Sequence, residues 1–465
     1  MQQDIRAGTS TGTAPGTMAA DLARIQVLAR APVASENDLK LNLANIYLEL
    51  YLADFAKYDL VAVRKMAAST MQALFELRLY LRGEIPGWAR RGFMSHDVQK
   101  ALRDVFRVTR YASDMLGELN IAHDKLPPGA KTRRGFTGDD INVLVNPAFQ
   151  TGGDLPFRSG DVIVVRGQAH NSAAIARIGD VDSQFSHIGI VHVDPAGRHF
   201  KVEALIESGS VITPLEAALE HGLGRAIVFR HRDAALAARA AALIHKRIAK
   251  RRLMRIWYDF SMRMDGYKRL YCSKLVRLAY LLASNHELQL PAYPTRLDMK
   301  NRDFLDRVGV KTIETFAPGD LEIDPRFDIV AEWQDYRITS SLRNQDLIVT
   351  KLFEFMENDG YTFEEDWTIR LIGLLGRLSA HLNEDAKDLI AGVVPKVPPN
   401  MKRKTIAVVA MLHKTAQPIL EKLNAIERDE IARTGHPPHP RDVFATLDEV
   451  KRTSGGRIGY LVAPA

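Results

Sequence analysis

Tyr271-Cys272-Ser273-Lys274-Leu275-Val276 is the stretch around which residues 158–280 are organised. Cys272 is the only cysteine in the 465 residues. Apolar residues follow it at helical spacings, namely Leu275, Val276, Ala279 and Tyr280. This periodicity predicts a helix that packs on a core and begins at or just before Cys272. The unpaired N–H groups and the positive dipole end of a first helical turn favour a thiolate over a thiol.

The best candidate for the base that such a cysteine needs is His187, which opens the strand-like run 187–193. A strand start can hold an imidazole rigidly against a helix, and His192 faces the opposite side of the strand. Glu203, in the next predicted strand, could accept a hydrogen bond from the second nitrogen of His187 and fix its tautomer. Glu207 is the fallback for this orienting role. The pattern therefore indicates a Cys/His pair supported by a carboxylate.

Each of these residues also has an interpretation without catalysis. A sole cysteine in a chain of this type is more often a buried small apolar residue than a nucleophile. A histidine at a strand end is more often only hydrogen-bonded, and Glu203 could form a salt bridge on a sheet face. The place of Cys272 at a helix start, after a polar loop, favours the nucleophile.

The neighbours of Cys272 supply candidates for oxyanion stabilisation and for substrate binding. The backbone N–H of Cys272 is the natural oxyanion donor. The Tyr258 hydroxyl could add a second donor, although core packing of this ring is equally expected, and Ser273 is a further supporting candidate. The residues that we expect to bind substrate are Ser186, Lys274 and Tyr271.

The composition is that of an ordinary soluble globular protein, with 46% hydrophobic and 26% charged residues. One cysteine allows no intrachain disulfide. The N-terminus has no apolar core that could act as a secretory signal, and no apolar run approaches the ~20 residues of a membrane span. We therefore expect a cytoplasmic protein by default, with export by a route that needs no signal peptide left open.

Much of the net charge of +7 lies in one cluster. One interpretation is a solvated helix end, where cations are favoured by the helix dipole. The other is a site for phosphate or an anionic membrane surface beside the active cleft. A nucleic-acid partner is not expected, because no aromatic residues are interleaved with the cluster. Its residues are Lys246, Arg247, Lys250, Arg251 and Arg252.

No metal or other cofactor is expected. His436 and His439 lie in a proline-rich loop that has no carboxylate or cysteine at metal-ligand spacing. No glycine-rich phosphate loop is present, and Gly152-Gly153-Asp154 is interpreted as a turn.

The chain divides into five regions by pattern. We predict a disordered tail over 1–17, a helical region over 18–125, an α+β catalytic domain over 150–290, a loop-rich connector over 291–340 and a helical C-terminal region over 341–465.

Within the central domain, tight turns between successive strands imply antiparallel pairing in a small meander sheet with helices on one side. The predicted strands are 161–166, 187–193, 200–204, 210–212 and 226–230, with a further possible strand at 308–312. Pro86-Gly87 is predicted to separate two helices of the N-terminal region. The helices expected in the C-terminal region are 347–355, 367–382, 386–393 and 404–423.

Five motifs together resemble the permuted NlpC-type papain-like cysteine hydrolases, in the YiiX-like branch. In ordinary members of the superfamily the cysteine precedes the histidine, whereas in the permuted branch the histidine strand comes first, as here. The resemblance covers about 158–285. The motifs, in order, are Gly160-Asp161-Val162-Ile163, Ser186-His187-Ile188-Gly189-Ile190-Val191, Val202-Glu203-Ala204, Tyr258-Asp259 and the Cys272 stretch.

This resemblance implies a papain-like core with Cys272 as nucleophile, His187 as base and Glu203 as the third polar residue. Lys274 departs from the pattern, because an acidic residue is expected after the Cys-Ser pair. The departure bears on the local charge around the thiolate and on the charge of the substrate.

Three hypotheses for function follow. The first is a thiol hydrolase that forms an acyl-enzyme on an amide or isopeptide bond, such as that of a peptidoglycan stem peptide or an amino-acyl conjugate. The second is a phospholipid acyl hydrolase or acyltransferase that acts at membranes, since permuted papain-like relatives include lipid-acting enzymes. A protein with this activity could serve as an antibacterial effector. The third is a non-catalytic helical interaction protein that carries a degenerate papain-like module. The partner of the helical regions is unknown in each case.

Overall fold

The fold is taken from a computed structural model that describes residues 17–121, 125–127, 129–149, 155–220, 222–251, 255–379 and 397–464. Four predictions fall wholly or largely outside these residues: the tail up to residue 16, the turn at 152–154, the helix at 386–393 and Arg252 of the basic cluster.

The centre of the molecule is a seven-stranded sheet in the order β1-β9-β6-β2-β3-β4-β5, antiparallel throughout. All five strands predicted between 161 and 230 are present. The first four pair in sequence order as expected, whereas β6 pairs with β2 and β9 and not with β5. The α+β class is therefore confirmed. The strands are β1 (Val143–Val145), β2 (Val162–Gly167), β3 (His187–Val193), β4 (His199–Leu205), β5 (Gly209–Pro214), β6 (Leu223–His231) and β9 (Phe327–Gln334).

The sheet extends beyond the predicted range 150–290, because β1 precedes it and β9 lies within the predicted connector. β9 is an inner strand between β1 and β6, yet it carries the charged residue Glu332, which is 1% exposed. Glu332 is tolerated there because Arg78 and Arg110, from helices far earlier in the chain, pair with it. Those partners are not visible in the local sequence, so the strand was missed.

The possible strand at 308–312 is wrong. Helix α9 (Asp303–Val308) ends there, and Gly309 caps it in the left-handed conformation with φ 108°. A glycine adopts this conformation at little steric cost, so Gly309 ends the helix. The β-branched residues on either side of it, Val308 and Val310, had indicated a strand. A two-residue strand, β8 (Glu314–Thr315), follows and pairs with β7 (Thr295–Arg296).

The N-terminal region is helical, as predicted, but its third helix runs straight through Pro86. Proline removes one intrahelical hydrogen bond, and here the loss is outweighed by burial of Ile85 and Trp88 on either side. The predicted break at Pro86-Gly87 is therefore wrong. The helices are α1 (Met18–Arg30), α2 (Glu36–Leu52), α3 (Leu60–Arg90) and α4 (His96–Asn120), with the 3-10 turn η1 (Phe55–Lys57).

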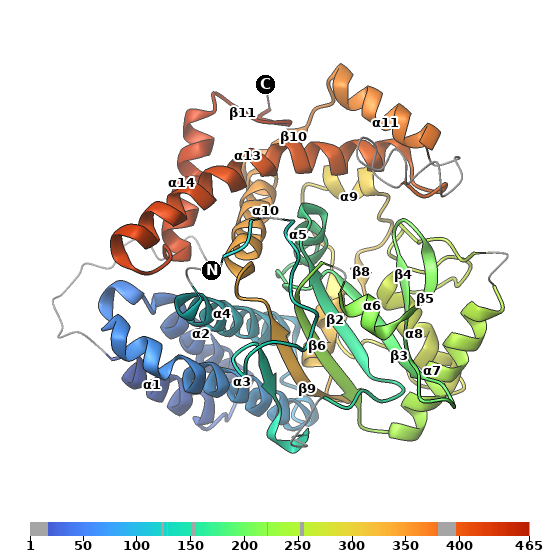
Figure 1. Ribbon diagram of the computed structural model, residues 1–465, viewed down its shortest axis with the longest axis horizontal. Helices are drawn as coiled ribbons and strands as arrows, with labels where there is room; N and C mark the ends of the chain where they lie inside the picture. Colours follow the sequence, from blue (N-terminus) through green and yellow to red (C-terminus); the bar gives the residue numbers. More distant parts are fainter. Residues whose placement is uncertain are drawn as a thin grey trace.

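The remaining helices cover the sheet and form a C-terminal layer. Helices α7 and α8 pack on one another and on β3 and β4, and α10 contacts both α4 and α5. Figure 1 shows the N-terminal helices at one side, α7 and α8 at the other and the C-terminal helices above them. These elements are α5 (His170–Arg177), α6 (Leu215–Leu219), α7 (Ala234–Ala249), α8 (Cys272–Ala283), α10 (Thr339–Asp359), α11 (Trp367–Ser379), α13 (Arg403–Thr434) and α14 (Pro440–Thr453).

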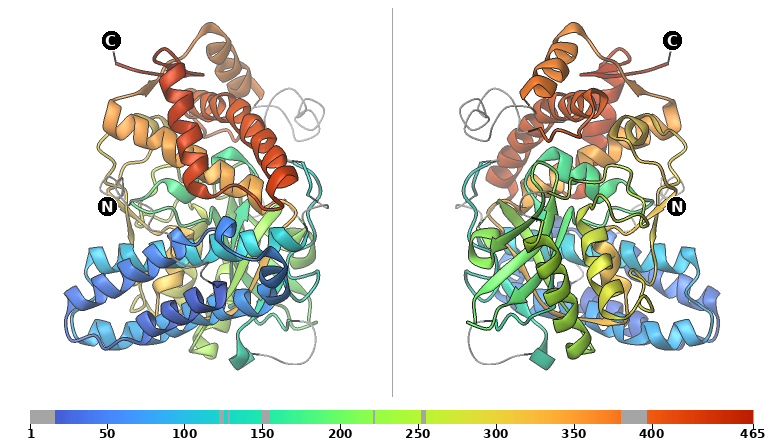
Figure 2. Two further views of the ribbon diagram at one scale, coloured as in Figure 1. Left: turned by 90° about the vertical axis from the view of Figure 1, so that its left-hand side faces the viewer. Right: turned by 90° about the vertical axis from the view of Figure 1, so that its right-hand side faces the viewer.

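The side views in Figure 2 show the same layers, with α1–α4 below the C-terminal helices in both orientations. Short strands and 3-10 turns complete the chain. They are η2 (Pro147–Phe149), η3 (Pro318–Ile323), β10 (Thr362–Phe363), β11 (Arg457–Ile458) and β12 (Leu461–Val462).

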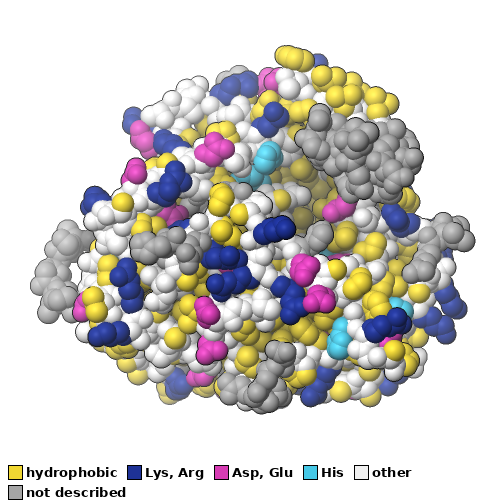
Figure 3. All heavy atoms as spheres, viewed as in Figure 1, with side chains coloured by type: hydrophobic (Ala, Val, Ile, Leu, Met, Phe, Trp, Pro, Cys, Tyr) yellow, Lys and Arg dark blue, Asp and Glu magenta, His cyan; other side chains and the backbone are white. Residues whose placement is uncertain are grey.

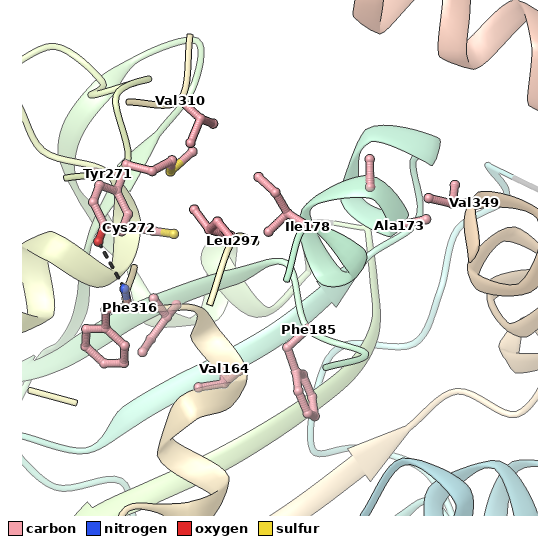
Figure 4. Packing of buried hydrophobic residues seen from close by; sticks show 14 of the residues in the cluster. Val164, Ala173, Ile178, Phe185, Tyr271, Cys272, Leu297, Val310, Phe316 and Val349 are labelled. Atoms are coloured by element: carbon pink, nitrogen blue, oxygen red, sulfur yellow. Dashed lines mark hydrogen bonds between the residues drawn. The ribbon is translucent and has the colours of Figure 1, made fainter. Parts of the chain in front are cut away.

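The largest hydrophobic core lies between the sheet, α5, α7, α8 and the C-terminal helices, and it includes Cys272. Figure 4 shows the Cys272 side chain directed toward Leu297 and Ile178. A second core joins α1 to α4. The Cys272 helix is thus anchored from several sides, which positions its first turn.

One helix, α11, leaves an apolar face on the surface. Trp367 is 75% exposed and Leu378 is 68% exposed, and Figure 3 shows hydrophobic side chains gathered over this helix. Among the helices of the described residues, none is both long enough and apolar enough to cross a membrane.

Candidate active site

Cys272 is the first residue of α8, as the sequence predicts. The preceding residue, Tyr271, provides no side-chain cap, so the N–H groups of the first turn receive no bond from it. The backbone N–H of Ser273 and its hydroxyl, with Oγ 4.0 Å from the Cys272 sulfur, both act on the thiol. These donors and the helix dipole favour a negative charge on the sulfur.

His187 is the first residue of β3, where it pairs with Val165 of β2. Its Nε2 lies 2.6 Å from Oε2 of Glu203. This contact leaves Nδ1 as the ring nitrogen for the thiol, and the imidazole interacts directly with Cys272 by hydrogen bonding and Coulombic attraction. The structure therefore brings together the three residues that the sequence singled out.

The pKa values describe an ion pair. Burial raises the pKa of the Cys272 thiol, but the hydrogen bond and charge of His187, with the donors of Ser273, outweigh burial and place this pKa below its ordinary value. Burial and the charge of Lys201 lower the pKa of His187, but its bonds to Cys272 and Glu203 prevail and raise it to about 9. Both shifts favour a thiolate–imidazolium pair over the neutral thiol and imidazole.

Glu203 lies on β4, opposite Gly189 of β3. Its Oε2 also accepts from Lys201, whose Nζ is 2.8 Å away. Burial raises the pKa of Glu203, but the charge of Lys201 and the bond to His187 lower it to about 2. Glu203 thus stays ionised across the neutral range and holds His187 through Nε2.

Lys201 was missed by the sequence analysis. Lys201 lies two residues before Glu203 on the same strand, so both side chains lie on the same face of the sheet. This i, i+2 spacing is the sequence signal from which Lys201 could have been predicted. Its aliphatic chain lies across Gly189, since a Cβ at Gly189 would come within 2.6 Å of Lys201 Cε. Lys201 is 3% exposed, so the glycine provides the space in which this buried cation reaches Glu203.

Tyr258 is buried, with 3% of its surface exposed. Burial, then the charge and a hydrogen bond of Cys272, raise its pKa well above the ordinary value. The hydroxyl is therefore a protonated donor directed at the sulfur. The supporting role of Tyr258 stays a prediction beside its packing in the core.

Lys274 does not add an open positive charge to the site. Its side chain is buried, and Nζ donates to Oδ2 of Asp259 at 2.7 Å. The ammonium also lies 5.8 Å from the centre of the Tyr267 ring. The departure from the family pattern is thus compensated by a partner fifteen residues earlier.

The other predicted residues lie next to the pair. The Tyr271 hydroxyl contacts Thr315 Oγ1 at 3.0 Å and accepts from the Phe316 N–H, as Figure 4 shows for the second bond. Ser186 Oγ accepts from the N–H of Gly167 and so ties β2 to the residue before His187. Ser273 is fully buried. The substrate-binding roles given to Ser186, Lys274 and Tyr271 stay predictions. Glu207 is exposed, and its charge contributes to the raised pKa of Tyr258.

In the described ranges, no group of three or more His, Cys, Asp or Glu side chains is arranged to hold a metal ion. What the site can do is hold a thiolate, keep a protonated imidazole beside it and place donors around the sulfur. These are the functional groups that nucleophilic acyl transfer requires.

Comparison with known proteins agrees with this geometry. Residues 157–331 match the model of the family described as "Permuted papain-like amidase enzyme, YaeF/YiiX, C92 family". The match spans β2 to most of β9 and includes all three residues of the Cys/His/Glu set. No curated protein and no solved structure matched the chain.

Proposed function

From the permuted papain-like cysteine hydrolase module over residues 157–331, we propose that this protein cleaves an amide or isopeptide bond through an acyl-enzyme on Cys272. The single observation that carries the proposal is the His187 imidazole held between Cys272 and Glu203.

The steps follow from the protonation states. The Cys272 thiolate attacks the carbonyl carbon, and the C=O electrons move to oxygen, which the N–H at the start of α8 and the Tyr258 hydroxyl can stabilise. The tetrahedral intermediate collapses, the C–N bond breaks, and His187 gives its proton to the leaving amine. Water then loses a proton to His187 and attacks the thioester, which releases the acid and restores the thiolate.

An amide is favoured over an ester by the acid that the site provides. An amine leaves only when it is protonated, and His187, with a pKa of about 9, is charged throughout the neutral range. Leu297 and Ile178 belong to the same hydrophobic core as Cys272, whose side chain points toward them in Figure 4, and such surroundings suit an acyl group with apolar parts. The substrate class that we propose is a peptidoglycan-type peptide or an amino-acyl conjugate.

A phospholipid substrate is the second candidate, and one observation favours it. A pocket on α7 is lined by Leu243, Lys246, Arg247, Lys250 and Arg251. Because α7 packs directly on α8, this basic pocket belongs to the same structural unit as the nucleophile. A phosphate or anionic headgroup there would explain the cluster.

The experiment compares wild type with Cys272→Ala on two substrate sets. The first set consists of N-acyl peptide amides and peptidoglycan stem peptides, and the second consists of anionic phosphatidylglycerol liposomes. Acid-quenched samples are analysed by intact mass. We expect an acyl adduct and released amine with an amide in wild type, and neither in Cys272→Ala, because the chain has no other thiol.

Two results would count against this proposal. Adducts that form from liposomes and from no amide would replace it with the lipid candidate. Equal hydrolysis by wild type and Cys272→Ala would remove Cys272 from the chemistry.

A further inference from the structure

A cavity of about 110 Å³ lies between the N-terminal and C-terminal helical regions, and no residue that lines it belongs to the candidate active site. Helices α1 to α4 form most of its wall, and α10 and α14 close it. Figure 1 shows α14 facing α1 and α2 at this side of the molecule. The apolar lining includes Leu22, Ile25, Leu50, Leu74, Leu116 and Phe444.

Two polar groups on the cavity wall have no partner among the described residues. Thr70 is 4% exposed, and its Oγ1 makes no hydrogen bond. The Nε of Arg107 is also buried and unbonded, although Nη2 of the same side chain donates to Asp104 at 2.7 Å. A buried hydroxyl or guanidinium N–H without a partner is costly, so these groups mark a place for a ligand oxygen.

The other charged groups of the wall are already paired. Asp21 pairs with Arg24 and also accepts from the Tyr58 hydroxyl, and Asp54 accepts from Arg441 at 3.1 Å. The carboxylates at the rim are therefore neutralised, and the free hydrogen-bonding capacity lies with donors. An oxygen acceptor fits this wall, whereas a cationic group does not.

We propose that this cavity binds a single hydrocarbon chain that ends in a carboxylate or carbonyl oxygen, as in a fatty acid or a short acyl chain. An apolar cavity of about 150 Å³ binds a small hydrocarbon rather than water. The chain's own sequence before Met18 is a poor alternative occupant, because its only large aliphatic side chains are Met1 and Ile5.

The cavity is connected to the strand of the catalytic histidine. Tyr111 lines the cavity and donates its hydroxyl to Asp182 Oδ2 at 3.2 Å. Oδ1 of Asp182 accepts from the N–H of Gln184 at 2.8 Å. Gln184 holds a left-handed φ of 59° three residues before His187. A ligand that moves Tyr111 therefore acts on the segment that sets the position of His187.

The binding test uses calorimetry on the full chain with butanoate, hexanoate and octanoate, and with octanedioate as the matched control. We expect saturable binding that tightens about fourfold for each added methylene. Octanedioate should bind at least tenfold more weakly than octanoate, because its second carboxylate would enter the apolar wall. No saturable binding by any chain, or octanedioate equal to octanoate, would overturn the site.

Two variants separate binding from folding. Thr70→Val removes the unpaired hydroxyl at nearly constant volume, so we expect a higher Tm without ligand and about tenfold weaker octanoate binding. Ser69→Ala, which removes an exposed hydroxyl from the same helix, is the control and should change neither. A Thr70→Val variant with a lower Tm and unchanged affinity would contradict the assignment.

The connection to His187 is tested separately from binding, by the rate of Cys272 alkylation at pH 7 with and without saturating octanoate. We expect at least a twofold change in wild type and none in Ala112→Leu, which adds a side chain to the cavity wall on α4. An unchanged wild-type rate under proven saturation would overturn the connection. This readout needs only the thiol, so it does not depend on the identity of the substrate.

Discussion

Replacing His187 with alanine is expected to lower kcat for amide hydrolysis by a factor on the order of 10⁴–10⁶. The variant loses both the cation that favours the Cys272 thiolate and the acid that protonates the leaving amine. The effect should fall on kcat much more than on KM, because these contributions matter in the transition state.

The matched control is His192→Ala. This residue lies on the same strand, but its ring stacks on His245 of α7 with centroids 4.2 Å apart. Its activity should stay within a few-fold of wild type. A His187→Ala enzyme that keeps more than a tenth of the wild-type kcat would contradict the assigned role.

Replacing Asp259 with alanine is expected to reduce the free energy of unfolding by about 3–5 kcal/mol. The change leaves the Lys274 ammonium buried without its carboxylate, in a side chain that is 1% exposed. Denaturant unfolding monitored by circular dichroism measures the loss.

The double variant Asp259→Asn/Lys274→Met removes both charges and should recover most of the stability, since a buried pair replaced by neutral groups often costs little. If Asp259→Ala costs under 1 kcal/mol, the pair is exposed in solution and Lys274 is available to act on substrate. Arg263→Ala, at an exposed ion pair with Asp265, is the control and should leave the free energy of unfolding close to that of wild type.

The catalytic part of the molecule could be predicted because its signals are local. The start of α8 follows from apolar spacing after Cys272, and β3 and β4 follow from short apolar runs between turns. The ordered motifs then placed His187 and Glu203 in a known arrangement. None of these steps required a contact between distant parts of the chain.

The rest could not be predicted because it depends on distant pairs. Glu332 can occupy an inner strand only because Arg78, 254 positions earlier, reaches it. Lys274 pairs with Asp259, fifteen residues earlier, and the sequence around Lys274 does not reveal this partner. The cavity between α1–α4 and α14 likewise exists only after both ends of the chain have packed together.

The most direct measurement is the rate of Cys272 alkylation by iodoacetamide from pH 4 to 10, in wild type and in His187→Ala. Cys272 is the sole cysteine, so the label reports one site. Because its burial slows the reagent in both proteins, the midpoint pH is compared rather than the absolute rate.

The sign of the expected shift follows from the ion pair. His187 lowers the pKa of the thiol, so the wild-type midpoint should lie below the ordinary thiol pKa of ~8.5 and move up toward it or beyond in His187→Ala. In wild type, alkylation should persist above pH 9, where the thiolate remains, while kcat/KM for an amide should fall as His187 loses its proton near its pKa of about 9. Coincident midpoints at or above ~8.5 in both proteins would contradict the thiolate–imidazolium pair.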